Sequence, residues 1–488
     1  MPSSPIVLAI DAGSTTAKAQ FFDASGRARG PAVRSPVPIG ADGTADPGGF
    51  VAAVDAAVDE ALRRWTDPVD AVALSCAWHG LVGLGPDGEP TTPLSTWSAT
   101  GPAVLAGATE LRRRLEAGDP EAVRRRTGAP VHPSLPPARL LAEGIRDPAA
   151  FGATARWCSI GELLETRWLA EAPGPSSSMA SGTGLFDQEA AAWDVDVLQA
   201  TSLRPETLAA VDDTPRRGLS PGYRSRWPAL AGAVWWPALG DGACALVGTG
   251  CDGDGRGRRA ALTVGTSAAV RVLAGPAERA ARPAGLFAYL LEPERVVLGA
   301  ARSNAGNLVP WLTSVLRLDH DLLSEVLART PGRHGLRADP ALAGERSPDW
   351  PLIASGSVAG LHPGTTAVDI AQAFLEAAAC GLADAIDLLE GAVDTFGRPL
   401  LLVGSGRALV SSPAWQQLLA DATGRSIIPS RVEEASARGA AVAALDGLGW
   451  REPASGADLD GEAVLPDPER AAAFAGLRGA GAAGSRSQ

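Results

Sequence analysis

Two short segments rich in glycine and small hydroxyl residues could bind phosphate groups. The apolar run 6–10 leads to Gly13-Ser14-Thr15-Thr16, and the apolar run 260–264 leads to Gly265-Thr266-Ser267. Glycine lets backbone N–H groups approach an anion closely, and hydroxyl groups add hydrogen-bond donors without bulk. Asp11, directly after the first run, can hold Mg²⁺ itself or through water, because this ion binds few carboxylates together with phosphate oxygens. The two segments predict that phosphoryl transfer is divided between two halves of the chain.

A carboxylate lies between these segments, in Gly240-Asp241-Gly242. Phosphoryl transfer to a hydroxyl depends mostly on positioning and electrostatics, together with a carboxylate that accepts the hydroxyl proton. Asp241 is the candidate base. Aspartate is also a favoured helix N-cap, and both roles can hold together because a helix N-terminus orients anions.

Length and composition limit the class of protein. A chain of 488 residues is too long for one ordinary core and predicts two large domains. A net charge of −12 argues against a nucleic-acid partner, because no basic stripe is available to neutralise phosphates. The five cysteines have no paired spacing and indicate reduced thiols. With no export signal and no apolar stretch long enough to span a membrane, we expect a cytoplasmic protein.

Lys18 is the only lysine in the chain, and almost all other positive charge comes from arginine. Its position beside the first phosphate segment suggests a contact with phosphate. A surface lysine on a strand is an equally good interpretation.

The order of apolar runs predicts two α/β domains of related plan with a cleft between them. A hairpin is expected at 6–10 and 17–22, a helix at 49–65, and a strand at 69–75 that delivers Trp78-His79 at its end. A similar plan restarts beyond Gly240. Its expected elements are strands 260–264, 268–273 and 399–403 and helices 370–389, 415–424 and 434–445.

Together these segments resemble the FGGY family of carbohydrate kinases, which has the actin/hexokinase-like ATPase fold. The resemblance covers roughly residues 5–447 and rests on the order and spacing of several weak motifs. These are 11–18, Trp78-His79-Gly80, 240–243, 263–267, 303–307, 404–406 with 412–421, and 433–441. It implies an α/β fold of two actin/hexokinase-like (ribonuclease H-like) domains flanking a cleft. We place the N-terminal domain at 1–237, the C-terminal domain at 238–447, and a flexible tail at 448–488.

Within the family the chain is most similar to gluconate kinases, through Thr127-Gly128-Ala129-Pro130-Val131-His132-Pro133 and the segment 180–187. One departure concerns the family's W-x-D-x-R pattern on the sugar side. Trp97 is present here, but Ala99 and Gly101 replace the carboxylate and the arginine. We therefore expect the acceptor pocket to favour a less polar relative of gluconate, such as a deoxysugar or a cyclitol.

The resemblance also implies roles for individual residues. His79, Trp97 and, more weakly, His132 would face the carbohydrate together with Asp241, although a histidine satisfied by backbone is an equal alternative for His79. ATP and Mg²⁺ are the implied cofactors, with Asp11 on the metal side. The residues implied to contact ATP are Gly13, Ser14, Thr15, Thr16, Lys18, Gly265, Thr266, Asn304, Gly404 and Ser405. Ordinary turns and local capping remain the alternatives for the glycines and for Asn304.

Three functions are compatible with these features. The first is an ATP-dependent kinase for a sugar acid, polyol or related carbohydrate. The second changes the acceptor to a deoxysugar or a cyclitol of specialised metabolism. The third is a non-catalytic, actin-like ATP-binding regulator, against which the retained Asp11 and Asp241 argue. As partners we expect a small carbohydrate, no nucleic acid and no membrane, and we allow for a homodimer.

Overall fold

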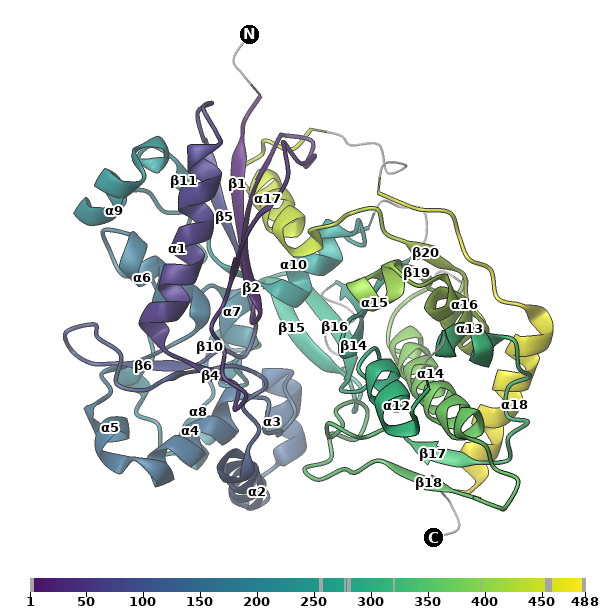
Figure 1. Cartoon of the computed structure of the whole chain (residues 1–488). Helices are drawn as coiled ribbons and strands as arrows, with labels where there is room; N and C mark the ends of the chain where they lie inside the picture. The colour runs from purple at the N-terminus through teal and green to yellow at the C-terminus, as the bar shows by residue number, and fades with distance from the viewer. Residues whose placement is uncertain are drawn as a thin grey trace. The chain divides into compact units, whose positions relative to one another are not determined.

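The computed structural model describes residues 4–253, 258–275, 278, 282–318, 321–395, 397–452 and 459–484. Contacts within the chain divide it into two units, each of which is discontinuous in sequence. The first unit comprises residues 1–248, 287–297 and 434–455, and the second comprises 249–286, 298–433 and 456–488. Each unit contains its own β-sheet with helices packed on it (Figure 1).

The sheet of the first unit has the strand order β11-β5-β1-β2-β3, and β12 also pairs with β5. The hairpin that the sequence predicts is confirmed, because β1 runs antiparallel to β2. Strand β5 runs parallel to β1, β11 and β12. The strands are β1 (Val7–Ala12), β2 (Thr16–Phe22), β3 (Val33–Pro36), β5 (Ala71–Cys76), β11 (Val234–Trp235) and β12 (Leu239–Gly240).

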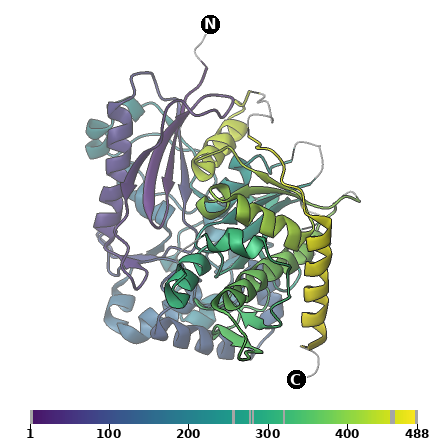
Figure 2. The same cartoon turned by 45° about the vertical axis from the view of Figure 1, so that its right-hand side comes forward.

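Helices cover this sheet on two sides (Figures 1 and 2). Helix α1 (Pro47–Arg63) packs against β2 and β3, and α17 (Ala435–Gly447) packs against β1 and β5. The Asp46 carboxylate caps α1 by accepting the Gly49 N–H, and Pro47 starts the helix with its φ already fixed. Helix α10 (Asp241–Gly248) packs so closely on α17 that a side chain at Gly439 would clash with the Cys244 carbonyl.

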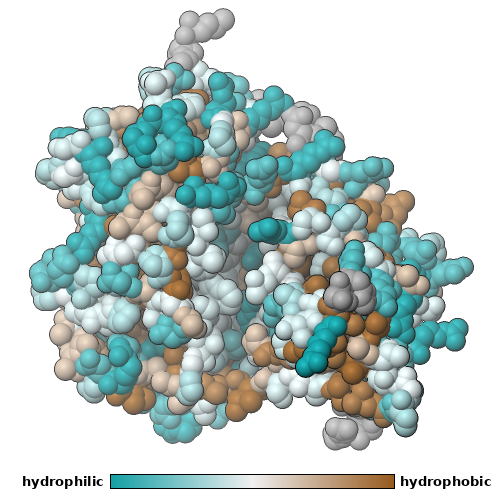
Figure 3. All heavy atoms as spheres, in the orientation of Figure 1, coloured by the Kyte–Doolittle hydropathy of each residue, from teal (hydrophilic) through white to brown (hydrophobic). Residues whose placement is uncertain are grey.

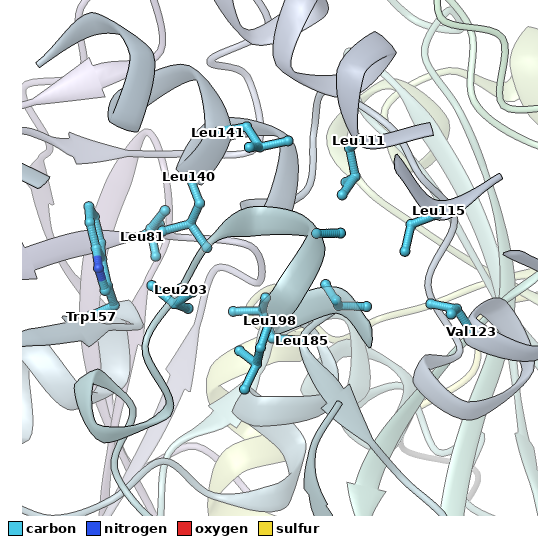
Figure 4. Packing of buried hydrophobic residues seen from close by; sticks show 12 residues of the cluster. Leu81, Leu111, Leu115, Val123, Leu140, Leu141, Trp157, Leu185, Leu198 and Leu203 are labelled. Atoms are coloured by element: carbon cyan, nitrogen blue, oxygen red, sulfur yellow. The ribbon is translucent and has the colours of Figure 1, made fainter. Parts of the chain in front are cut away.

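The first unit has further helices, some of which contribute buried side chains to a second apolar core (Figure 4). They are α2 (Pro102–Leu115), α3 (Pro120–Thr127), α4 (Pro136–Arg146), α5 (Pro148–Ala153), α6 (Ile160–Trp168), α7 (Ser177–Ser181), α8 (Val195–Thr201) and α9 (Pro221–Arg226). The unit also contains short strands: β4 (Thr44–Ala45), β6 (Val82–Leu84), β7 (Leu94–Ser95), β8 (Arg156–Cys158), β9 (Phe186–Asp187) and β10 (Ala192–Trp193). Strand β15 (Phe287–Glu292) also belongs to this unit and contacts α7.

The sheet of the second unit repeats the plan of the first. Its strand order is β16-β14-β13-β19-β20, in which β13 is antiparallel to β14 and parallel to β19. The strands are β13 (Arg259–Val264), β14 (Ala268–Ala274), β16 (Arg295–Arg302, of which 298–302 belong to this unit), β19 (Leu401–Ser405) and β20 (Ile427–Pro429). The restart of the strand plan that the sequence predicts is therefore confirmed.

The second unit is completed by helices and one small hairpin. The helices are α12 (Leu308–Leu316), α13 (Leu322–Leu327), α14 (Ala367–Gly391), α15 (Arg407–Val410), α16 (Pro413–Thr423) and α18 (Pro468–Gly484), and the hairpin is β17 (Arg337–Asp339) with β18 (Ser357–Ala359). Thr366 and Asp369 form a capping box at the start of α14.

Helix α18 differs from the flexible tail that the sequence predicts for 448–488. Phe474 is fully buried. Arg470 donates from Nε to the buried carboxylate of Asp421 at 2.7 Å and from Nη1 to the carbonyls of Leu327 and Arg329. A buried ring and the ion pairs of Arg470 and Arg478 dock a segment whose Ala/Gly-rich sequence shows little periodicity. Residues 453–458 and 485–488 lie outside the described part of the chain.

The surface is polar over most of the face seen in Figure 3, and hydrophobic atoms gather on the second unit near α12. Trp311 and Val315 of α12 are among the exposed large apolar residues. Among the described residues, no helix combines the length and the apolar character that a membrane crossing requires.

Candidate active site

Three parallel strands of the first unit bring distant residues to one edge of the sheet. In the register of β1 with β5, Asp11 lies opposite Ser75, and in the register of β12 with β5, Gly240 lies opposite Cys76. The carboxyl ends of parallel strands meet at the same edge, where ligands of α/β proteins usually bind. Asp11, Trp78 and Asp241 therefore gather there. We call Asp11, Lys18, Glu434 and Asp241 the charged edge.

Lys18 lies on β2 directly opposite Asp11 and connects two carboxylates. Its Nζ lies 3.2 Å from Asp11 Oδ2 and 2.8 Å from Glu434 Oε2. Both carboxylates are largely buried, and a quarter of the Lys18 side chain is exposed. The chain's only lysine thus lies within an ion-pair cluster, where its charge is held close to the first phosphate segment.

The environment changes the pKa values of this cluster. Burial raises the pKa of Asp11, and the charge of Lys18 and the hydrogen bond from Ser75 Oγ at 2.9 Å oppose that rise. Burial alone would lower the pKa of Lys18, but the charges and hydrogen bonds of Asp11 and Glu434 outweigh it, so the pKa is raised. Lys18 is therefore a firmly charged ammonium at neutral pH.

Glu434 was given no role by the sequence analysis, although it lies in one of the motifs. It immediately precedes α17 and also pairs with Arg34 of β3. Arg438, one turn into α17, is buried and donates to the carbonyls of Gly26 and Gly248. These contacts hold the start of α17 against the turn after β2 and the end of α10, and Glu434 lies next to this start, beside Lys18.

Asp241 is the first residue of α10, as its role as a helix start predicts. Its Oδ1 accepts the N–H of Gly242 at 2.8 Å and the N–H of Trp78 at 3.3 Å. The carboxylate is thus oriented by two backbone donors from two segments. Such fixed orientation is what a general base needs, and the helix N-terminus stabilises its negative charge.

Trp78 is held in a narrow slot beside Asp241. A side chain at Gly182 or at Gly240 would clash with the indole ring, so both positions need glycine. The indole Nε1 donates to the Ser178 carbonyl at 3.1 Å. Tyr289 of β15 packs edge-on against Trp78 with ring centroids 5.1 Å apart. The sequence analysis missed Tyr289, which has no motif of its own.

His79 has a left-handed backbone, with φ of 67°. This conformation is unfavourable for a residue with a side chain and is typical of constrained functional sites. Its Nδ1 donates to the Gly182 carbonyl at 2.5 Å, which fixes the proton on that nitrogen. Tyr289 packs edge-on against the imidazole at 5.3 Å. Both the backbone-satisfied histidine and a role beside the substrate are compatible with this geometry.

The other two predicted carbohydrate residues lie elsewhere in the first unit. Trp97 is half-buried and follows β7. His132 is buried, and its Nδ1 hydrogen-bonds with Ser134 Oγ at 2.8 Å. His132 borders a cavity of only about 20 Å³ with mostly apolar walls. A cavity of this size is too small for a sugar, and a contact of His132 with the substrate stays a prediction.

The first phosphate segment forms the turn between β1 and β2. Gly13 and Ser14 are half-buried and Thr15 is exposed, so the backbone and hydroxyl groups of the turn are accessible. The Thr15 carbonyl accepts the Val37 N–H at 3.1 Å, and Thr16 already belongs to β2. The turn thus connects two paired strands of the sheet, which is the hairpin that the sequence predicts.

The second phosphate segment forms the turn between β13 and β14 in the second unit. The Gly265 carbonyl accepts the Gly306 N–H at 3.1 Å, and the Thr266 carbonyl accepts the Asn307 N–H at 3.2 Å. A side chain at Gly306 would clash with the Gly265 carbonyl. The turn and the 303–307 segment, separate motifs in the sequence, thus lie side by side.

Ser405 reaches the same end of the sheet through β19. Thr263 and Ser405 are opposite each other in the parallel register, and their hydroxyls are 3.1 Å apart. Gly406 has φ of 87° and lies against Val264, where any side chain would clash with the backbone. Gly404 lies inside β19 and is buried. We call Gly265, Thr266, Asn304 and Ser405 the uncharged edge.

Asn304 is buried, and its amide is used by neighbouring backbone. Its Nδ2 donates to the Gly344 carbonyl at 2.8 Å, and its Oδ1 accepts from the Ala343 N–H at 3.1 Å and from Asn307 Nδ2 at 3.2 Å. These hydrogen bonds agree with the alternative interpretation of Asn304, in which its side chain caps neighbouring backbone groups and does not contact ATP. Asn304 then shapes the turn that carries Gly306.

The residues around Asp11 suit a Mg²⁺ that is held mainly by phosphate oxygens and water. Within the described ranges, no cluster of three or more His, Cys, Asp or Glu side chains could hold a metal ion. Both oxygens of Asp11 are already hydrogen-bonded, to Lys18 and to Ser75. A water-mediated contact from Asp11 fits this donor set, since Mg²⁺ keeps several waters and takes few protein carboxylates.

Ala99 and Gly101 line a pocket of about 320 Å³ in the first unit. We call it the α2–α4 pocket, since α2 and α4 contribute much of its wall; Arg139 of α4 also lines it. Its walls include neither Asp241 nor His79 nor Trp97. The two positions that depart from the family pattern therefore face a compartment without the predicted catalytic residues.

The chain matches the models of both domains of a known protein family. Residues 6–217 match the model of the N-terminal domain of the FGGY family of carbohydrate kinases, and residues 260–446 match its C-terminal domain. A gluconokinase of Bacillus subtilis is 24% identical over 399 residues, covering 78% of this chain and 74% of that protein. A glycerol kinase of Rhodospirillum rubrum is 30% identical, covering 94% and 93%. The crystal structure of a gluconate kinase from Lactobacillus acidophilus superposes with a TM-score of 0.85 at 24% identity, covering 98% and 97%.

Proposed function

Since the chain belongs to the FGGY family of carbohydrate kinases, we propose that it transfers the γ-phosphoryl group of ATP to a hydroxyl of a sugar acid, polyol or related carbohydrate. Asp241 is the general base of this proposal. The observation that carries it is the orientation of the Asp241 carboxylate by the N–H groups of Gly242 and Trp78 at the start of α10.

In this mechanism the acceptor hydroxyl gives its proton to the Asp241 carboxylate as its oxygen attacks the γ-phosphorus. The bond from phosphorus to the bridging oxygen breaks, and ADP leaves with the electron pair. Lys18 supplies a fixed positive charge near the turn 13–16, where the hydroxyls of Ser14 and Thr15 donate to phosphate oxygens. When bound, Mg²⁺ would neutralise charge on the phosphates, with Asp11 holding one of its waters.

In this proposal the residues of the uncharged edge bind ATP. The turn Gly265-Thr266 offers backbone N–H and hydroxyl donors, and Gly306 lets the neighbouring segment pack against it. Ser405 extends this surface toward the adenosine. Asn304 acts indirectly, by holding the segment that contains Gly306.

We infer the class of acceptor from residues of the first unit. Trp78, His79 and Tyr289 pack against one another next to Asp241. Trp78 and Tyr289 are buried and His79 is half-buried, so His79 is the one of the three that can reach a carbohydrate hydroxyl. Similarity to gluconate kinases favours a sugar acid. The deoxysugar or cyclitol alternative rests on Ala99 and Gly101, which line a pocket without Asp241, and we rank it second.

The deciding experiment measures ADP release with ATP and Mg²⁺ on a panel of sugar acids, polyols, deoxysugars and cyclitols. Saturable turnover on a sugar acid or polyol, with kcat/KM of about 10⁴ M⁻¹s⁻¹ or more, supports the first proposal. A preference for a deoxysugar or cyclitol selects the second. ATP binding without turnover on any member of the panel would overturn both and favour a regulator.

A further inference from the structure

The α2–α4 pocket has the size and walls of a small-molecule site. Its volume of about 320 Å³ lies within the range typical of ligand pockets. The apolar part of the wall comes from Leu81, Trp157, Ala142 and the start of α2 at Pro102, Ala103 and Val104. None of the residues that we assign to phosphoryl transfer lines it.

The floor of the pocket is part of a packed core. Leu81 and Trp157 belong to the cluster of buried residues that also includes Leu140 and Leu141 of α4 (Figure 4). The floor of the pocket is therefore made of side chains that are packed in this core. An apolar cavity of even about 150 Å³ takes up a benzene ring.

One wall holds a buried arginine that has no acidic hydrogen-bond partner. Arg139 is 3% exposed and donates to the carbonyls of Thr96, His79 and Ser134, the last at 3.3 Å. Its Nε is buried and makes no hydrogen bond with any described residue. Burial lowers the pKa of Arg139 to about 9, which still leaves it charged at neutral pH.

The other charged residues of the pocket do not neutralise Arg139. Glu143 forms a two-pronged ion pair with Arg146, one turn further along α4. The carboxylate of Asp42 accepts hydrogen bonds from Thr44, in an exposed loop. The position that carries a carboxylate in the family pattern is Ala99, which also lines the pocket. The buried guanidinium therefore lacks a counter-charge within the described residues.

We propose that the α2–α4 pocket binds a small organic monoanion, with its carboxylate at Arg139 and a compact apolar body against Leu81 and Trp157. The ligand supplies the negative charge that Ala99 does not. The residues that line this pocket differ from those proposed for the acceptor site, although Arg139 also donates to the carbonyl of His79.

The test uses the full-length protein and two pairs of probes that share a shape and differ in charge. Benzoate is compared with benzamide, and isobutyrate with isobutyramide, by ligand-observed NMR and calorimetry. Gly101→Trp and Val104→Trp fill the pocket. Gly101 has φ of −60° and nothing within 4 Å of an added Cβ, so this change is compatible with folding. Gly152→Trp is the matched control, since Gly152 is also exposed and uncrowded but lies in α5, outside the pocket wall.

We expect at least one carboxylate to bind about tenfold or more tightly than its amide, since hydrogen bonds to charged groups are the stronger ones. Binding should be lost in Gly101→Trp or Val104→Trp and kept in Gly152→Trp. Equal affinity for acid and amide would overturn the role of Arg139. Binding that survives both pocket-filling changes, or no binding of either carboxylate, would overturn the site itself.

Discussion

The two sheets end in edges of opposite character, although they share one strand plan. At the charged edge, four ionisable side chains lie close to the ends of β1, β5 and β12, and Lys18 joins two of them. At the uncharged edge, the ends of β13 and β19 present glycine, hydroxyl and amide groups. The same topology thus carries a group of charged side chains in one unit and closely packed backbone in the other.

The difference shows how each edge is made rigid. The charged edge is fixed by ion pairs that burial strengthens, and these contacts respond to pH. The uncharged edge is fixed by sterics: Gly306 and Gly406 lie where any side chain would strike neighbouring backbone. Substitutions that change charge should therefore impair the charged edge most, and substitutions that change side-chain volume should impair the uncharged edge most.

The largest effect is expected from the general base. Asp241→Asn keeps the shape and the hydrogen bonds from Gly242 and Trp78 but cannot accept the hydroxyl proton. We expect kcat to fall by about two to four orders of magnitude, while ATP affinity measured by calorimetry stays within about threefold. Asp67→Asn, in an exposed loop, is the matched control. Turnover near that of the unaltered protein would remove Asp241 from the mechanism.

A change of volume should damage the uncharged edge. Gly306→Ala places a methyl group against the Gly265 carbonyl and must displace the turn Gly265-Thr266. Displacements of about 1 Å near reacting groups cost on the order of 10²-fold, so we expect kcat/KM for ATP to fall by about ten- to a hundredfold.

Gly391→Ala serves as the control for this change, because an added Cβ at Gly391 meets nothing within 4 Å. Steady-state kinetics with varied ATP provide the measurement. Equal kinetics for Gly306→Ala and Gly391→Ala would show that close packing at this edge has no part in nucleotide binding.

A change of charge should damage the charged edge in a pH-dependent way. Lys18→Met leaves Asp11 and Glu434 buried without their shared cation and should lower the free energy of unfolding by about 1–3 kcal/mol at pH 7, between the values for buried and exposed pairs. Because burial raises the pKa of Asp11 in the folded state, its ionisation already costs stability as pH rises above the unfolded value, and Lys18 reduces that cost.

The loss caused by Lys18→Met should therefore be large at pH 7 and smaller near pH 4, where Asp11, whose pKa is raised by burial, takes up a proton and no longer needs the cation. Urea unfolding at both pH values measures it, and Lys18→Arg, which keeps the charge, is the control. A loss that is the same at pH 4 and pH 7 would mean that packing of the lysine stem, not its charge, is what matters.

The sequence predicts the strands and the turns of both edges because they are local. The apolar runs before Gly13 and before Gly265 predict β1 and β13, and glycine with hydroxyl residues predicts the turns. Glu434 and Tyr289 could not be assigned in this way. Glu434 pairs with Arg34 across 400 residues of sequence, and only the packing of α17 brings them together. Helix α18 was missed because a buried phenylalanine and the ion pairs of two arginines dock it, and its sequence shows little periodicity.

The smallest effect is expected where the sequence alone predicts a large one. Loss of the family's carboxylate and arginine at Ala99 and Gly101 suggests a change of acceptor. In the structure, however, both residues line the α2–α4 pocket, whose walls lack Asp241, His79 and Trp97. Gly101→Arg should therefore change kcat/KM for each acceptor by less than about threefold, whereas a residue in direct contact with a substrate group changes it by 10-fold or more. Kinetics on the full acceptor panel measure this. A shift of tenfold or more toward ordinary sugar acids would place Gly101 beside the acceptor and extend the charged edge to this region of the first unit.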